Sequence, residues 1–286
     1  MRTHKLYPYL LIAPALIFIT LVSLYPTLYS LYLSLNRSRR GQLEFVGLRN
    51  FEIILTSQDF WESLRHTLVF GIFFLVLVMF LAFILALMFN RGLKLGGLFM
   101  TIVFLPWMLS EIVSGVMFRW LFLPGIGLAQ RLLGPLFNDI TFLGNPAGAM
   151  GVVTGATLWR SMAFGMLLIL AGLQTIPADI YEAAKIDGAS RWQSFWKVTW
   201  PLVLPTTQVT IVFLTILAIN AAGMFLSITG GGPGRATEVL SLYMYREAIL
   251  FFNFGYGAAL SVIMFGLNAI LAVVYLRALR SRGGLE

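Results

Sequence analysis

The sequence predicts an all-α integral membrane protein with six transmembrane helices in a single domain, residues 1–286. Two observations support this fold class. Of the 286 residues, 59% are hydrophobic and 11% are charged, whereas soluble domains carry about 25% charged residues. Six apolar stretches also reach the roughly 20 residues that a helix needs to cross the hydrocarbon of a bilayer. They occupy residues 9–33, 67–89, 99–122, 148–173, 202–228 and 255–276.

The first apolar stretch predicts a retained helix, because it is too long for the core of a signal peptide and no convincing small-residue cleavage site follows it. Six spans place both termini on the same side of the membrane. Lys and Arg favour the cytoplasmic side, and the two ends of the chain carry clean basic clusters, whereas basic residues of the opposite loops are interleaved with acids. We therefore expect a multi-pass protein of the cytoplasmic (inner) membrane with both termini cytoplasmic. The terminal clusters are Arg2, Lys5, Arg277, Arg280 and Arg282.

Three segments between the spans have recognisable patterns. Residues 36–66 contain apolar side chains at helical spacing, which predict a short amphipathic helix on the outer surface: Phe51, Ile54 and Leu55. Residues 229–234 place four glycines around a proline, a composition typical of a flexible turn. Residues 238–251 have enough apolar positions for a helix over the outer mouth.

The longest polar interlude in the second half of the chain, residues 177–201, predicts a cytoplasmic loop of two short helices. Asp179 is placed to cap the first helix, just after Pro177. Gly188 stands where a left-handed residue ends that helix. Ser190 is placed to cap the second helix, which we expect to run through Trp200 with aromatic residues along one face. That face comprises Trp192, Phe195, Trp196 and Thr199.

The motif Glu182-Ala183-Ala184, followed by Gly188 and by Val198-Thr199-Trp200-Pro201, resembles the EAA signature of permease subunits of ABC importers. The spacing matches throughout, although Val198 and Trp200 replace the isoleucine and leucine of the signature. With the fuller string YEAAKIDGAS and the later TGGGPG, the chain is similar to the carbohydrate-uptake branch, to subunits of the maltose-permease F or glycerol-3-phosphate-permease A type.

This resemblance implies a type I ABC importer permease fold in which residues 177–201 form the coupling loop. It implies that the first short helix docks in a cleft of a cytoplasmic ATPase, with Glu182, Ala183, Ala184, Asp187 and Gly188 as coupling residues. The alternative is a plain helix-turn-helix whose alanines pack on the chain's own spans. The implied partners are a second permease in a heterodimer, two copies of the ATPase and an extracytoplasmic substrate-binding protein.

The sequence contains no features of an enzyme. It has no G-x-x-x-x-G-K-[ST] motif to hold nucleotide phosphates, no cysteine, and only two histidines, His4 and His66, in unrelated segments. We therefore expect no cofactor or metal on this chain, with ATP and magnesium bound by the partner ATPase. The net charge of +8 is explained by membrane orientation rather than by nucleic-acid binding.

Charged residues inside a span are candidates for function, because each costs at least ~2.5 kcal/mol at the bilayer centre unless it is paired or hydrated. Glu111 in the third span and Arg160 in the fourth fall at similar depth. They either form an ion pair with a structural role or line the translocation pathway, and these alternatives stay open. Arg119 lies near a span end and is expected to snorkel to the interface.

Polar and aromatic residues of the later spans are further pathway candidates. Thr157 and Ser161 share a helix face with Thr154, a polar stripe that suits sugar hydroxyls. Phe164 is able to stack on a sugar ring, as is Trp107. Asn220 adds an amide near the end of the fifth span. Each polar side chain is, taken alone, more often an interhelical hydrogen-bonding group than a ligand contact.

The function predicted is that of a membrane-spanning subunit of an ATP-driven, binding-protein-dependent sugar importer. The same machinery carrying glycerol-3-phosphate or a polyol is the alternative within that class. A secondary transporter would show broken helices and ion-coupling acids, and a membrane enzyme would need paired acids, a metal site or a nucleophile with its base.

Overall fold

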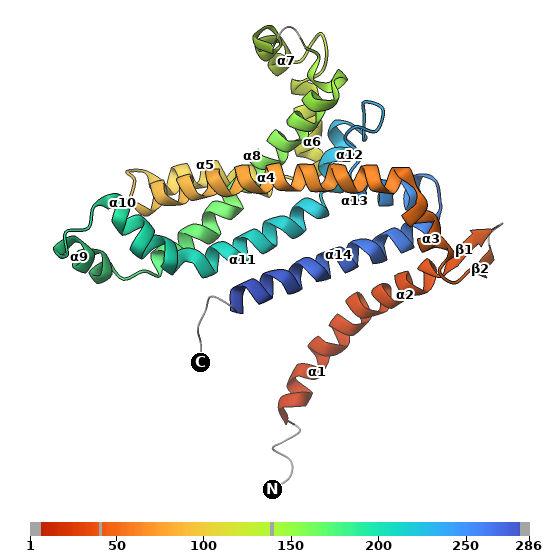
Figure 1. The fold of residues 1–286 in the computed structure, drawn as a ribbon, viewed down its shortest axis with the longest axis horizontal. Coiled ribbons are helices and arrows are strands. Elements are labelled where there is room, and N and C mark those ends of the chain that lie inside the picture. The colour runs from red at the N-terminus through yellow and green to blue at the C-terminus, as the bar shows by residue number, and fades with distance from the viewer. Residues whose placement is uncertain (1–6, 40–41, 138–139, 281–286) are drawn as a thin grey trace. The chain divides into compact units, whose positions relative to one another are not determined.

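The computed structural model describes residues 7–39, 42–137 and 140–280 of the chain (Figure 1). These residues form two compact units. The first contains the chain up to Trp61 together with Tyr243–Leu267. The second contains Glu62–Leu242 and the chain from Asn268 onward. The basic residues Arg2, Lys5 and Arg282 of the predicted cytoplasmic ends lie outside the described residues.

The first unit begins with the predicted first span. Helix α1 (Tyr7–Ile19), the π-helical turn η2 (Thr20–Leu24) and α2 (Tyr25–Ser34) follow one another without a gap. They provide a continuous apolar helix from Leu11 to Ser34, which is long enough to cross a bilayer. The side chains along it are almost all exposed within this chain, as expected of a helix that faces lipid or another subunit.

A β-hairpin that the sequence did not suggest follows this span. Strands β1 (Asn36–Arg39) and β2 (Gln42–Phe45) pair antiparallel, with Asn36 opposite Phe45. The buried amide of Asn50 holds the hairpin's start, because its Nδ2 donates to the carbonyl oxygens of Ser34 at 2.7 Å and Asn36 at 3.0 Å. Strands of only four mostly polar residues show too little alternation of apolar and polar side chains to be recognised in a sequence.

The remaining helices that lie wholly or partly in the first unit were predicted. Helix α3 (Arg49–Thr56) is the short amphipathic helix of residues 36–66. The predicted helix of residues 238–251 corresponds to a continuous helical segment. It consists of α13 (Leu240–Tyr245) followed by the π-helical turn η6 (Arg246–Leu250). Helix α14 (Phe254–Arg280) is the sixth span, and Ser261 on it lies 2.9 Å from Ser30 of α2, Oγ to Oγ.

The second unit is built around α8, the most buried of the span candidates. Figure 1 shows α4, α5 and α11 alongside α8, and α6 and α12 next to each other. The helices and turns of this unit are α4 (Gln58–Asn90), α5 (Gly96–Met108), α6 (Glu111–Leu121), α7 (Leu128–Leu133), η3 (Gly134–Phe137), η4 (Phe142–Gly144), α8 (Pro146–Gln174), α9 (Ala178–Ile186), α10 (Arg191–Ser194), η5 (Phe195–Thr199), α11 (Trp200–Ile219) and α12 (Ala222–Ile228).

Helix α4 shows why these helices suit a membrane. It buries a residue on every fourth position: Phe70, Phe74, Val78, Ala82 and Ala86. Between Leu68 and Phe89 its other faces are also apolar but more exposed, so this part of the helix has no polar side. A helix that is apolar all round belongs in a membrane or in the centre of a large protein. The two alanines on the buried face pack with Met166, Ile169 and Leu173 of α8 in the core of this unit.

The third predicted span, residues 99–122, is not one helix. It consists of α5 and α6, which are bent by 96° at a break after Met108. The backbone of Leu109 is extended, with φ −74° and ψ 144°, and its carbonyl is bonded outside the helix by Arg160. Helix α6 restarts at Glu111, which places a carboxylate in the first turn, where the helix dipole favours it. Apolar periodicity continues through the break and therefore concealed it.

The fifth predicted span, residues 202–228, is also divided. The apolar helix runs from Arg191 to Ile219, through α10, η5 and α11, and Asn220 terminates it. The separate helix α12 then packs on α6. The described residues contain five helices able to cross a membrane, and six if the bent pair of α5 and α6 is counted as one span. The prediction of six spans corresponds to the upper count.

Candidate functional site

The break between α5 and α6 is held by a cationic side chain from α8. Arg160 Nε donates a hydrogen bond of 3.0 Å to the Leu109 carbonyl, and Arg160 Nη1 lies 3.7 Å from Glu111 Oε1. The Arg160 side chain is 14% exposed and that of Glu111 33% exposed. The structure thus brings together the two charged residues that the sequence placed at similar depth.

Aromatic rings cover this charged pair. The Arg160 guanidinium lies 4.9 Å from the centre of the Trp107 ring, within the range of a cation–π contact. Phe164, one turn beyond Arg160, stacks on Trp107 with ring centres 4.6 Å apart and an interplanar angle of 23°. Phe213 of α11 lies 4.6 Å from Phe164, also between centres. Helices α5, α8 and α11 therefore place a cluster of three aromatic rings next to the Arg160 guanidinium.

Small residues let α6 and α12 approach closely beside the pair. A Cβ added to Gly223 of α12 would lie 2.6 Å from Glu111 Oε2, so a larger residue would displace this carboxylate from its present position. Gly115 on α6 faces Ser227 on α12 in the same way, since an added Cβ would collide with the serine side chain. Small residues at such spacing permit close helix packing in membranes.

The predicted polar stripe of α8 is mostly turned inward. Thr154 and Thr157 donate to the carbonyls one turn before them, Met150 and Val153, at 2.7 and 2.8 Å. Thr157 is 2% exposed and Ser161 is fully buried, and the Ser161 hydroxyl has no hydrogen-bond partner among the described residues. Thr157 and Ser161 therefore pack within the second unit, whereas Thr154 is only half-buried. Ser161 is therefore the one of the three whose hydroxyl donor is unused.

Asn220 lies at the end of α11, apart from the stripe. Its Nδ2 donates to the Ile216 carbonyl at 2.7 Å, one turn earlier, and the residue is exposed. The amide oxygen has no hydrogen bond among the described residues, so it is available to a ligand. The residue marks the end of the span, where the chain turns into α12.

The polar loop of residues 177–201 begins with α9. The prediction that Asp179 caps this helix is wrong: the helix starts at Ala178, Pro177 precedes it without a side-chain cap, and Asp179 lies in the first turn. Gly188 has φ +76°, so the left-handed end predicted for the helix is confirmed. Glu182, Ala183 and Asp187 are exposed, and Ala184 is half-buried.

The second helix of the loop starts as expected and ends differently. Ser190 Oγ accepts from the Gln193 backbone N–H at 3.3 Å, and the Gln193 side chain accepts from the Ser190 N–H at 2.8 Å, a complete capping box. The helix does not stop at Trp200 but continues through η5 into α11. Pro201 therefore lies inside a continuous helical segment, two residues after the π-helical turn η5.

The aromatic face of this helix is only partly buried. Trp192 is 70% exposed and Trp196 46% exposed, whereas Thr199 is 6% exposed. The π-helical turn η5 shifts the face that an ideal period predicts. Thr199 Oγ1 lies 3.2 Å from the Tyr181 hydroxyl of α9, so one hydrogen bond joins the two helices of the loop.

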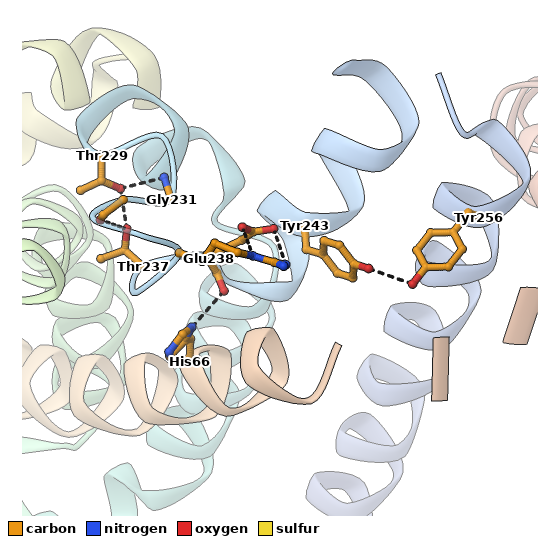
Figure 2. Close-up of polar contacts among 9 residues, drawn as sticks. His66, Thr229, Gly231, Thr237, Glu238, Tyr243 and Tyr256 are labelled. Carbon is orange, nitrogen blue, oxygen red and sulfur yellow. Dashed lines mark hydrogen bonds and ion pairs between the residues drawn. The ribbon is translucent and has the colours of Figure 1, made fainter. Parts of the chain in front are cut away.

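The glycine-rich segment of residues 229–234 is a hydrogen-bonded turn rather than an open one (Figure 2). Thr237 Oγ1 donates to the Gly232 carbonyl at 2.7 Å and lies 2.7 Å from Thr229 Oγ1. The Gly231 N–H donates to Thr229 Oγ1 at 3.2 Å. Figure 2 also shows His66 of α4 at the Glu238 carbonyl, with its Nδ1 3.3 Å from that oxygen.

Buried polar pairs stabilise the segment that follows. Arg235 donates to both carboxylate oxygens of Glu238, at 2.9 and 3.2 Å, and the Glu238 side chain is 2% exposed. In the first unit, the Tyr243 and Tyr256 hydroxyls lie 2.8 Å apart (Figure 2). Burial and the hydrogen bond with Tyr256 raise the pKa of the Tyr243 phenol above its ordinary value.

Sequence reasoning identified four of the residues at the charged break but missed the others. Glu111, Arg160, Trp107 and Phe164 were singled out because charge and aromatic rings are conspicuous in a span. The Leu109 carbonyl, Phe213 and Gly223 have no such signal: a backbone acceptor, one more Phe and one more Gly are indistinguishable in a chain with 24 Phe and 27 Gly.

These features define a helical membrane protein of the transport class, with a charged pair at a broken span and a polar helix pair at the end of α8. The chain belongs to the family of inner membrane components of binding-protein-dependent transport systems, whose model matches residues 79–280. It is a permease subunit rather than an enzyme.

Curated relatives match over nearly the whole chain. The sulfoquinovosyl glycerol permease protein SmoG of Agrobacterium fabrum is 33% identical over 97% of this chain and 92% of its own length. The sn-glycerol-3-phosphate permease protein UgpA of the same organism is 33% identical over 98% and 96%. The trehalose/maltose permease protein MalF of Thermococcus litoralis is 35% identical over 96% and 94%.

A solved structure shares the fold. In the crystal structure of a bacterial ABC transporter for import of the acidic polysaccharide alginate, one chain superposes with a TM-score of 0.83. It covers 98% of this chain and 96% of that chain at 21% identity. The expected ABC importer permease fold is therefore confirmed.

Proposed function

We propose that this chain is the membrane-spanning subunit of an ATP-driven importer that carries a sugar across the cytoplasmic membrane. The observation that carries the proposal is the similarity, over nearly the full length, to permeases named for trehalose and maltose and for a sulfoquinovosyl glycerol. The aromatic cluster of Trp107, Phe164 and Phe213 supports it, because ring faces stack on the apolar faces of sugars.

Within this function, the charged break favours a neutral sugar. An anionic substrate such as glycerol-3-phosphate would need a cation with free hydrogen-bonding capacity. Arg160 is already shared by the Glu111 carboxylate, the Leu109 carbonyl and the Trp107 ring. Glycerol-3-phosphate or a polyol remains the second candidate, supported by the relative named for sn-glycerol-3-phosphate.

In this proposal, α9 transmits the motion of a separate ATPase, which binds ATP and magnesium. Its exposed surface carries the acids Glu182 and Asp187, the small Ala183 and an isoleucine, Ile186, that is 85% exposed. In this proposal Ile186 enters a groove of the ATPase, and the small Ala183 lets the helix approach it closely. Gly188 and the capped start of α10 then fix the angle between the two helices.

The partners are two ATPase copies, a second permease and an extracytoplasmic binding protein. The surface of α6 supports the proposal of a second permease. It exposes a row of large apolar side chains beside a cavity of ≈ 490 Å³. The cavity is lined by Val116, Met117, Trp120, Leu121 and Leu128. The second permease or lipid would cover these side chains.

The test is ATP-dependent uptake in proteoliposomes that contain the assembled transporter and its binding protein. We expect accumulation of a radiolabelled neutral di- or oligosaccharide, and loss of accumulation with Gly188→Pro, since proline cannot adopt φ +76°. Asp179→Asn, an exposed change in the helix that precedes Gly188 and outside the coupling residues, is the control and should retain uptake.

Two outcomes would contradict the proposal. Purification of the chain without any ATP-hydrolysing partner would remove the energy source. Unchanged accumulation by the Gly188→Pro transporter would show that the helix pair does not transmit motion. Uptake of glycerol-3-phosphate with no uptake of neutral sugars would select the second candidate instead.

A further inference from the structure

A cavity of ≈ 450 Å³ lies between the end of α4, the end of α8 and the helix pair formed by α9 and α10. Its volume falls within the range of about 300–1,000 Å³ that small-molecule sites occupy. Neither the charged break nor the coupling residues contribute to its lining. The cavity is lined by Leu87, Asn90, Arg91, Leu173, Tyr181, Arg191, Ser194, Phe195 and Thr199.

Two arginines from separate segments share this cavity. Arg91 follows the last residue of α4, and Arg191 is the first residue of α10. Both are exposed, and neither forms an ion pair with another described residue. No Asp or Glu belongs to the lining. The cavity therefore has unneutralised positive charge on two sides, a setting that attracts an anion.

The carboxyl ends of α4 and α8, which border the cavity, do not supply this charge. The carboxyl ends of α4 and α8 each contribute a partial charge of about −0.5, which together offset roughly one positive charge. Two guanidinium groups exceed that sum by about one unit. Each guanidinium also presents a planar set of donors that matches the oxygen atoms of a phosphate group.

The remaining lining is amphipathic. Leu87, Leu173 and Phe195 supply apolar surface, whereas Tyr181, Ser194 and Thr199 supply hydroxyl groups. The Ser194 hydroxyl makes no hydrogen bond among the described residues, so it is free to contact a ligand. Because α4 and α8 are apolar spans that end here, the cavity lies where a bilayer places its headgroups. Nearby Trp192 and Trp196 are exposed, as is usual for tryptophan at that depth.

We propose that this cavity binds a phosphate-bearing anion, which bridges Arg91 of the α4–α5 connection and Arg191 of the coupling loop. The bound group fixes the helix pair of α9 and α10 on the end of the spans. The phosphate comes either from the headgroup of an anionic phospholipid or from a soluble phosphate ester, and the apolar wall fits the acyl-bearing form. Binding itself does not depend on which sugar is carried.

The experiment is native mass spectrometry of the assembled transporter, titrated separately with phosphatidylglycerol, phosphatidylcholine and soluble glycerol phosphate. The variant is Arg91→Gln with Arg191→Gln. The matched control is Lys94→Gln with Lys197→Gln, which removes the same charge from the same two segments, at exposed positions outside the cavity. Single Arg91→Gln and Arg191→Gln variants serve if the double variant does not assemble.

We expect phosphatidylglycerol to bind about tenfold more weakly to the arginine variant, and the lysine control to bind as the unmodified transporter does. The same loss for glycerol phosphate, without an effect on lipid, would support the soluble source. Equal losses in both double variants would overturn the proposal, because they would indicate attraction by net charge alone. Unchanged binding by the arginine variants, or equal binding of phosphatidylcholine, would also overturn it. Binding is measured without transport, so the outcome is separate from the uptake test.

Discussion

Arg160 illustrates how one side chain organises a broken span. Its guanidinium donates a hydrogen bond to the Leu109 carbonyl, forms an ion pair with the Glu111 carboxylate and lies over the Trp107 ring. Helix ends inside a membrane must have their backbone groups satisfied, since no water is available in the hydrocarbon. A side chain that is always charged and carries five donors meets this need at a bend of 96°.

At this scale we predict that Arg160→Gln destabilises the protein by about 1–3 kcal/mol, because the Leu109 carbonyl and Glu111 lose their partner. The midpoint of thermal unfolding in detergent should fall, and sugar uptake should fall with it. Arg119→Gln, an exposed change near the end of α6, should leave both unchanged. If Arg160→Gln and Glu111→Gln each preserve stability and uptake, the pair neither stabilises the fold nor lines the translocation pathway.

A double-mutant cycle distinguishes a structural pair from a pathway role. If the pair is only structural, combining Glu111→Gln with Arg160→Gln should recover stability by about 0.5–3 kcal/mol relative to the sum of the single changes, and uptake should recover in parallel. If Glu111 or Arg160 contacts the sugar, stability should recover while uptake stays low. The measurement is thermal unfolding combined with initial uptake rate for all four proteins.

At the scale of helices, packing depends on the small residues between α6 and α12. We predict that Gly115→Ala destabilises the unit by about 1–3 kcal/mol, because the new methyl group collides with Ser227. Gly151→Ala of α8, where an added Cβ meets nothing within 4 Å, should not destabilise it. Thermal unfolding of the two variants tests this, and equal midpoints would show that α6 and α12 tolerate separation.

The coupling loop gives a second prediction for elements. Gly188→Ala should cost about 1–2 kcal/mol locally, since φ +76° is unfavourable for a residue with a Cβ. Ser190→Ala removes the capping hydroxyl of α10 and should cost about 1 kcal/mol. Hydrogen exchange of residues 178–194 should become faster in both variants, with exchange in α4 unchanged. Unaltered exchange in the loop would mean that partners, not local structure, set its conformation.

At the scale of the molecule, the six-span topology predicts which loops face which side. The sequence has no cysteine, so single cysteines can be introduced without further substitution. Lys185→Cys in α9 and Leu136→Cys in η3 lie beyond opposite ends of α8, and both positions are exposed. A membrane-impermeant maleimide added to intact cells should label Leu136→Cys and not Lys185→Cys. The reverse pattern would invert the proposed orientation.

The sequence by itself determined the membrane class, the approximate position of the spans and the polar loop, because length and composition must satisfy the bilayer wherever the chain folds. It also determined Gly188 and the Ser190 capping box, since these interactions join residues within a few positions of each other. The EAA resemblance correctly indicated the family, whose model matches residues 79–280.

Only the tertiary structure decided where α5 stops, where α11 ends and which polar residues are hidden. The break at Leu109 is satisfied by Arg160, 51 residues away, and the close approach of Gly223 to Glu111 joins two helices far apart in sequence. Thr157 and Ser161 share a helix face with the spacing of a polar pathway, yet that face is buried by neighbouring helices. Periodicity fixes which side chains share a face, whereas packing between distant segments fixes what that face meets.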